Sequence, residues 1–245
     1  MRRTRQETLA DTGIFHKFWM GHNRASVFAT DDEKRAYLNA LCITRNKKIV
    51  GVVDWFSYCI MSNHPHEVGA ASGDPAKRIS RKTAITRFGD WMRNAHSRFG
   101  RFYNDKHKRE GAVASGRPKT SLLKSDRAVL RAMFYGDANP VRARMASHPI
   151  KYKWSSAKFY CIGETNEFTQ HLTEPAAYTA LGRTPKQRQF RYLRLLNHYL
   201  RLEGLLKDVC PDEGDSIALP ESMCIDRAIQ ELMAGANNIR GRPPG

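Results

Sequence analysis

The sequence predicts an α+β fold in which helices cover one face of an antiparallel sheet. Two observations predict this class. Apolar patterns along residues 13–147 follow the order strand, helix, two strands, helix, strand and helix. The two middle strands, residues 47–62 and 64–72, follow each other directly, which is typical of an antiparallel pair.

The first strand is predicted at residues 13–20, where Phe15, Phe18 and Trp19 are candidates for packing. Thr30 and the two aspartates after it are residue types that begin helices, because their side chains cap free backbone N–H groups. The helix that they start has one apolar face and is expected to run to about residue 44.

The β-rich stretch 47–62 predicts one long strand with a kink at Gly51. Its return strand, residues 64–72, is closed by the turn residues 73–75. Residues 79–104 then place apolar side chains on one side and arginines on much of the rest. This pattern predicts a helix that packs on the sheet and turns a basic face toward phosphates.

A flexible stretch and a short strand follow within residues 111–123. Ser125 and Asp126 then provide the cap of a second helix over residues 127–147, which contains Pro140. The predicted order of the elements is then β-α-β-β-α-β-α.

A shift in composition predicts a domain boundary near Gly163. Residues 1–163 are expected to form the main domain, 164–208 a basic helical extension and 209–245 a poorly structured tail. The tail contains Arg-Gly-Arg-Pro at residues 240–243, the core pattern of a motif that fits a narrow DNA minor groove. A solvated basic tail is the alternative.

Charge is the strongest global feature of the chain. Its 245 residues carry a formal net charge of +17, and basic residues cluster between residues 77 and 109. The usual large anion for such a surface is nucleic acid. No apolar stretch approaches the ~20 residues that span a bilayer, so no membrane partner is expected. The five scattered cysteines form no metal or disulfide pattern and predict a reduced, cytoplasmic protein.

Two histidines, His64 and His66, flank Pro65 at the end of an apolar run. Because side chains alternate along an extended segment, both imidazoles are expected on one side, where they could hold a divalent metal ion with a further ligand. The alternative is an ordinary polar pair at the end of a strand.

Tyr135 and Asn139 are four residues apart in the predicted second helix and therefore share one face. Asn139 could offer its amide oxygen to a metal, while the phenol of Tyr135 attacks a phosphate that the metal polarises. Tyr103 is a rival nucleophile, because His107 follows it at the same spacing.

Four segments in this order, "YCIMSNHPH", "RFYNDKHKREGAVASGRPKTSLL", "FYGDANPVRA" and "YKWSS", resemble the REP-associated tyrosine transposases, a family of HUH single-strand DNA endonucleases. The resemblance implies a ferredoxin-like catalytic domain that cuts single-stranded DNA hairpins with Mg²⁺ or Mn²⁺ and leaves a 5′-phosphotyrosine. It implies that His64, His66 and Asn139 bind the metal and that Tyr135 is the nucleophile. Association with the nucleoid, as a monomer or a homodimer, would follow.

We therefore expect a metal-dependent single-strand DNA endonuclease and strand transferase. A structured-nucleic-acid-binding protein without catalysis is the alternative, suggested by Pro65 and Glu67, which differ from the family pattern. A zinc hydrolase is disfavoured because no third histidine or carboxylate pair has a convincing spacing. The candidates for phosphate contact are Arg78, Arg81, Lys82, Arg117, Lys119 and Arg142.

Overall fold

The computed structural model describes residues 3–45, 48–206, 219–220 and 222–238. The chain divides into two compact units, which are described separately. The first comprises Met1–Lys124 and Asn166–Thr173, and the second Ser125–Thr165 and Glu174–Gly245. The first segment of the first unit therefore ends directly after its last strand, and a short segment beyond Gly163 returns to that unit.

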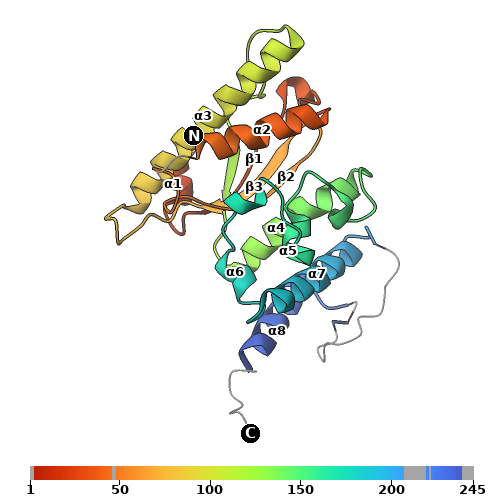
Figure 1. Cartoon of the computed structure of the whole chain (residues 1–245). Coiled ribbons are helices and arrows are strands. Elements are labelled where there is room, and N and C mark those ends of the chain that lie inside the picture. The colour runs from red at the N-terminus through yellow and green to blue at the C-terminus, as the bar shows by residue number, and fades with distance from the viewer. Residues whose placement is uncertain (1–2, 46–47, 207–218, 221, 239–245) are drawn as a thin grey trace. The chain divides into compact units, whose positions relative to one another are not determined.

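The first unit is built on a four-stranded antiparallel sheet (Figure 1). Its strands are β1 (Ile14–Phe18), β2 (Asp54–Ile60), β3 (Pro65–Ala70) and β4 (Lys119–Leu122), in the order β2-β3-β1-β4. Helix α2 (Asp31–Thr44) connects β1 to β2, and α3 (Arg81–His107) connects β3 to β4. This β-α-β-β-α-β order is the ferredoxin-like arrangement. The predicted fold class is confirmed.

Helices α2 and α3 pack together and cover one face of the sheet (Figure 1). Side chains alternate along β1, so Phe15 and Lys17 point toward the helices and His16 and Phe18 toward the other face. Phe15 stacks on Phe88 of α3 with ring centroids 4.1 Å apart. The short helix α1 (Arg5–Leu9) lies against α3 and β4.

The helices of the first unit begin where capping residues stand. The hydroxyl of Thr30 and the carboxylate of Glu33 form a capping box at the start of α2, and Ser80 accepts a hydrogen bond from the backbone N–H of Thr83 at the start of α3. Such caps satisfy backbone N–H groups that have no partner inside the helix. The start of α2 is confirmed at the predicted threonine.

Strand β2 is shorter than predicted, and the expectation of a kinked strand through Gly51 was wrong. Gly51 lies in a turn with φ +75°, a left-handed conformation that glycine adopts without strain. Pro65 is the first residue of β3, opposite Ile60 of β2. A proline is tolerated at the first position of a strand, because its missing N–H interrupts the ladder least there.

The second unit is helical in its described part. It contains α4 (Asp126–Arg142), α5 (Ala157–Ile162), α6 (Ala176–Thr179), α7 (Pro185–Leu202) and α8 (Ile225–Asn238). Ser125 caps α4, as predicted. Short 3-10 turns occur in both units, at His22–Arg24, Pro149–Lys151 and Thr169–His171.

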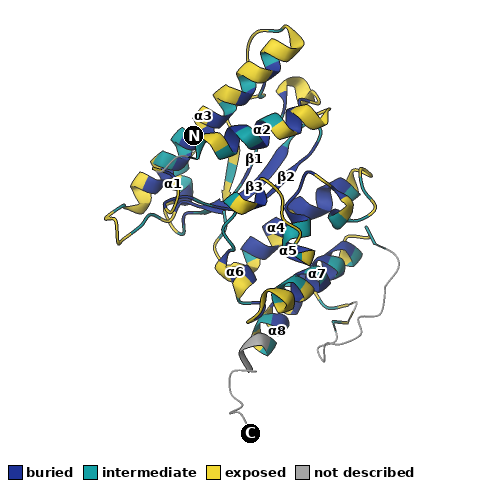
Figure 2. Ribbon diagram, viewed as in Figure 1, coloured by how far each residue is buried: buried dark blue, intermediate teal, exposed yellow. Residues whose placement is uncertain are grey.

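The core of the second unit is aromatic. Tyr192 of α7 packs on Phe134 of α4 and Tyr160 of α5, with ring centroids 5.1 and 5.4 Å apart, and the sides of these helices that carry the three rings are buried (Figure 2). Tyr178 donates a hydrogen bond to the carbonyl of Tyr160.

Helix α8 occurs where the sequence predicted a poorly structured tail. The Arg-Gly-Arg-Pro motif at residues 240–243 lies outside the described residues. Within the described ranges, none of the helices is long and apolar enough to cross a membrane.

Candidate metal and nucleic-acid site

The first candidate feature is the histidine pair at the start of β3. The rings of His64 and His66 are adjacent, with centroids 4.7 Å apart and an angle of 83° between their planes. His66 is buried, and His64 is half-buried. The two imidazoles are therefore close enough to contact one bound ion.

A third histidine, His16 of β1, joins the pair, and the sequence analysis missed it. Nε2 of His16 lies 2.9 Å from Nδ1 of His66, and the two rings stack with centroids 5.1 Å apart. One of these nitrogens donates a hydrogen bond to the other and fixes the orientation of the His66 ring. The sequence did carry one signal for His16: side chains alternate along "IFHKF", so His16 is on the other face of the strand from the packing residue Phe15.

Burial favours the neutral form of His16 and His64, which is the form that binds metals. It lowers the pKa of His16 to about 4 and lowers the pKa of His64. Among the described residues, no three His, Cys, Asp or Glu side chains are arranged to hold a metal ion together. A metal at His64 and His66 would therefore complete its shell with oxygen ligands from other sources.

The same face of the sheet carries a cation. Lys119 of β4 is paired with Phe18 of β1, and its ammonium group lies 5.6 Å from the Phe18 ring centroid. The Phe18 ring is in turn 5.8 Å from the His66 ring. A phosphate at the histidine pair would thus have a positive charge nearby.

Glu67, which follows His66, points to the opposite, helix-covered face. Its carboxylate forms an ion pair with the buried Lys17 of β1 and accepts a hydrogen bond of 2.5 Å from the hydroxyl of Tyr37. Burial lowers the pKa of Lys17, and the Glu67 charge offsets part of this shift. Glu67 is therefore explained by a partner inside the core of the first unit.

In the second unit, helix α4 presents Tyr135 and Asn139 on one face, linked by Arg142. The Arg142 guanidinium lies 5.2 Å from the Tyr135 ring centroid and donates a 2.9 Å hydrogen bond to Oδ1 of Asn139. It also pairs with Glu203 at 3.1 Å. Tyr135 is 42% exposed, which makes its phenol accessible to a large substrate.

Asp137 lies between these two residues in sequence but points into the core of the second unit. The hydroxyl of Tyr192 donates a 2.8 Å hydrogen bond to its Oδ2. Burial raises the pKa of Asp137 to about 7, against the lowering effect of this hydrogen bond. Asp137 is a buried acid held by a phenol.

The rival nucleophile Tyr103 is buried near the end of α3. Its ring contacts His107, as the spacing predicted, with centroids 4.3 Å apart. His107 is also hydrogen-bonded to Glu33 at 2.8 Å. This group therefore joins α3 to α2 and leaves Tyr103 little access to a substrate.

The predicted phosphate contacts of the first unit occupy different settings. Arg78 and Lys82 are exposed around the start of α3. Arg81 donates hydrogen bonds to the carbonyls of Ala10 and Asp11, which tie the end of α1 to α3. Arg117 lines a cavity beside β4.

Comparison with known proteins adds little to this description. No protein-family model matches the chain, and no curated protein matches it. A solved structure described as a REP-associated tyrosine transposase bound to a REP hairpin is similar over 72% of this chain and 96% of its own, with 11% identity and a TM-score of 0.48. A likeness at this level carries no argument about activity.

Proposed function

We propose that the chain is a transposase-like, metal-dependent single-strand DNA endonuclease and strand transferase. Its substrates would be DNA hairpins, cut through a 5′-phosphotyrosine intermediate. The observation that carries the proposal is the pairing of the His64 and His66 rings, with centroids 4.7 Å apart, beside Lys119 in a chain of net charge +17. Neutral metal ligands beside a cation suit a polyanionic substrate.

The residues present fit a hard divalent cation in part. His64 and His66 would hold Mg²⁺ or Mn²⁺, with Asn139 proposed as an oxygen ligand. When bound, such an ion polarises a phosphoryl oxygen and stabilises the charge that develops on it. His16 would hold the His66 ring in place, and Lys119 would attract the phosphate.

Tyr135 is the proposed nucleophile. Its Oη attacks phosphorus and loses its proton to solvent, while the P–O3′ bond breaks and the leaving 3′ oxygen takes up a proton. The 5′ side of the DNA then remains on the protein as a phosphotyrosine ester, which conserves a phosphodiester for rejoining. The guanidinium of Arg142, 5.2 Å from the ring centroid, would hold the Tyr135 ring in place through a cation–π contact.

A labelled single-stranded hairpin library tests this proposal. The full chain is incubated with it in Mg²⁺, Mn²⁺ or EDTA, and the products are run on a denaturing gel. We expect a protein-linked DNA band that needs metal, disappears in Tyr135→Phe and persists in Tyr103→Phe. Loss of the band in Tyr103→Phe alone would move the nucleophile to α3.

The alternative is a binding protein for structured DNA that does not cut. One observation favours it: Oδ1 of Asn139 already accepts a hydrogen bond from Arg142. A carbonyl oxygen has a second lone pair, so this contact does not block a metal ligand. Retarded but uncut hairpins on a native gel, with no divalent metal bound by calorimetry, would establish the alternative.

A further inference from the structure

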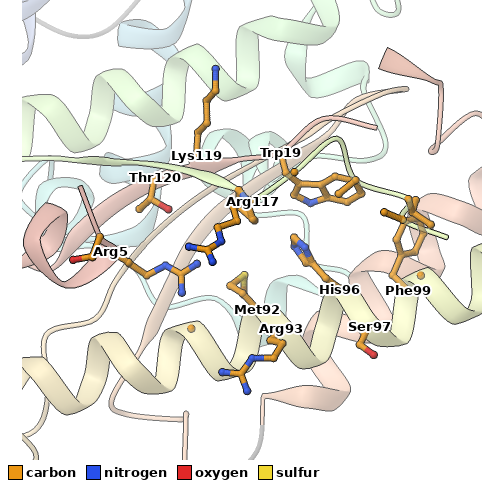
Figure 3. Close-up of a pocket in the computed structure, with 18 of the residues that line it drawn as sticks. Arg5, Trp19, Met92, Arg93, His96, Ser97, Phe99, Arg117, Lys119 and Thr120 are labelled. Atoms are coloured by element: carbon orange, nitrogen blue, oxygen red, sulfur yellow. The ribbon is translucent and has the colours of Figure 1, made fainter. Parts of the chain in front are cut away.

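The first unit contains a cavity of about 1430 Å³ (Figure 3). It lies between α1, α3, β4 and the segment that precedes β4, on the helix-covered side of the sheet, where Trp19 and Thr120 contribute to its wall. None of the described residues that line it is acidic. Its basic lining residues are Arg3, Arg5, Arg93, Arg101, Arg117 and Lys119.

Two of these arginines converge, and no acidic side chain lies between them among the described lining residues. The side chains of Arg5 and Arg117 extend toward each other from opposite sides of the cavity (Figure 3). Burial lowers the pKa of Arg5, and the charges of Arg117 and Arg93 lower it further. Arg5 is held in position over the Phe88 ring, 5.1 Å from its centroid. An anion between the two guanidinium groups would remove their repulsion.

The Arg5 guanidinium approaches α3 closely at Gly89. A Cβ at Gly89 would lie 2.7 Å from Nη1 of Arg5, so any larger residue there would displace the guanidinium. The cavity floor also contains Trp19, Met92, His96 and Phe99. Three of these four are buried, whereas His96 is half-buried, with its ring centroid 5.0 Å from that of Trp19. A histidine ring is a surface on which a nucleic-acid base stacks.

Basic residues at the edge of the sheet connect the cavity with the histidine face. Strand β4 is an edge strand; Arg117 lies two residues before its first residue, Lys119. Both residues line the cavity, but the Lys119 side chain extends away from Arg117 (Figure 3), and its ammonium group lies over Phe18 on the histidine face. A chain of phosphates could therefore pass from Arg5 and Arg117 over β4 to Lys119.

We infer that this cavity binds an unpaired segment of single-stranded DNA, with a backbone phosphate between Arg5 and Arg117 and a base against His96. Small-molecule pockets occupy roughly 300–1,000 Å³, so a cavity of about 1430 Å³ suits more than one nucleotide. The inference rests on the proposed function, because it takes DNA as the substrate.

A charge-matched comparison of variants tests the cavity. Arg5→Gln/Arg117→Gln removes two cations from it, and Arg87→Gln/Arg98→Gln removes two cations of α3 that do not line it, of which Arg98 is exposed and Arg87 is half-buried. Affinity for a labelled, unstructured single-stranded oligonucleotide is measured by fluorescence anisotropy over a range of salt concentrations.

We expect the cavity variant to bind at least about tenfold more weakly. The slope of log affinity against log salt concentration should become shallower by about 0.7 for each phosphate that the variant no longer neutralises. The matched variant should change affinity by less than about threefold, because neither of its two cations lines the cavity. Equal decreases in the two variants would overturn the inference, since affinity would then follow net charge alone.

Two further measurements separate this inference from misfolding and from the proposed function. The cavity variant should unfold at the same or a higher temperature than the wild type, because a repulsive pair is removed; a lower temperature would show that the arginines serve the fold. If the wild type forms the Tyr135 adduct and the cavity variant binds DNA as tightly as the wild type does, the cavity site alone is overturned. Absence of any DNA binding would overturn both.

Discussion

Lys17 and Arg5 are two cations of the first unit with opposite surroundings. Lys17 is fully buried, the Glu67 carboxylate neutralises its charge, and the Tyr37 hydroxyl accepts a hydrogen bond from its ammonium group. Arg5 is partly buried and faces two other arginines. A buried cation with an internal counterion stabilises the fold, whereas neighbouring cations without a counterion can bind an anionic ligand. Within the first unit, the comparison thus distinguishes cations that stabilise the fold from cations that can bind a ligand.

Removal of the internal counterion should have the largest effect. Glu67→Leu leaves the Lys17 ammonium buried and unpaired, which is expected to cost about 3–5 kcal/mol of unfolding free energy. The double variant Lys17→Met/Glu67→Leu should recover most of this loss, because it buries no charge. Urea denaturation followed by circular dichroism measures both. A Glu67→Leu protein as stable as the wild type would show that Lys17 does not depend on this carboxylate.

The opposite face of the sheet holds a neutral cluster, and a substitution there should affect metal binding more than folding. His16→Ala removes the hydrogen-bond partner of His66 Nδ1 and is expected to weaken Mn²⁺ binding about 10–100-fold. His16→Gln, which keeps a polar partner, should recover part of the affinity. Calorimetric titration of Mn²⁺ measures the effect.

The matched control is His22→Ala, which removes an exposed histidine outside the cluster. Its Mn²⁺ affinity should equal that of the wild type. Equal decreases in His16→Ala and His22→Ala would mean that the metal binds histidines nonspecifically and that the pair at β3 is no site.

The elements of the fold were predictable because their signals are local. Caps at Thr30 and Ser125 and alternation in β1 each act within a few residues, and the order of the elements then allows few topologies. The turn at Gly51 was missed because β-branched residues on both sides of it favour a strand, while a left-handed glycine conformation leaves no mark on the pattern.

The site was only partly predictable, because its contacts join distant segments. His64 and His66 are two residues apart, so their common side follows from alternation. His16 reaches His66 across 50 residues, through the register of β1 against β3. The meeting of Arg5 with Arg117 likewise needs α1 to pack on α3 and β4. Sequence spacing carries no information on such pairs.

Asp137 in the second unit is an intermediate case, a buried acid with a hydrogen bond but no cation. Its pKa of about 7 in the native protein lies above its ordinary value of 3.8, so the native state binds the extra proton. Stability should therefore fall as the pH rises from about 4 to about 7. Asp137→Asn mimics the protonated acid and should flatten this dependence.

Thermal and urea unfolding at several pH values check the expectation. At pH 8 the asparagine variant should be more stable than the wild type by about 1–2 kcal/mol, and at pH 4 the two should agree closely. Parallel curves for the two proteins would contradict ionisation of Asp137 as the cause.

The smallest effect is expected at Arg93, a cavity residue whose acidic counterion can be removed by one substitution. Arg93 lines the cavity but pairs with the exposed Asp90 at 2.5 Å. Asp90→Asn removes this counterion, and because exposed ion pairs contribute only about 0.2–1 kcal/mol, stability should hardly change. Single-stranded DNA should bind about two- to threefold more tightly at low salt, and the gain should vanish at high salt as the charges are screened. Asp105→Asn, which neutralises an acid of α3 that does not line the cavity, provides the control and should give a smaller gain. Weaker DNA binding by Asp90→Asn would mean that the ion pair holds Arg93 in position for its ligand. An arginine with an internal counterion would then contribute to DNA binding, contrary to the distinction drawn between Lys17 and Arg5.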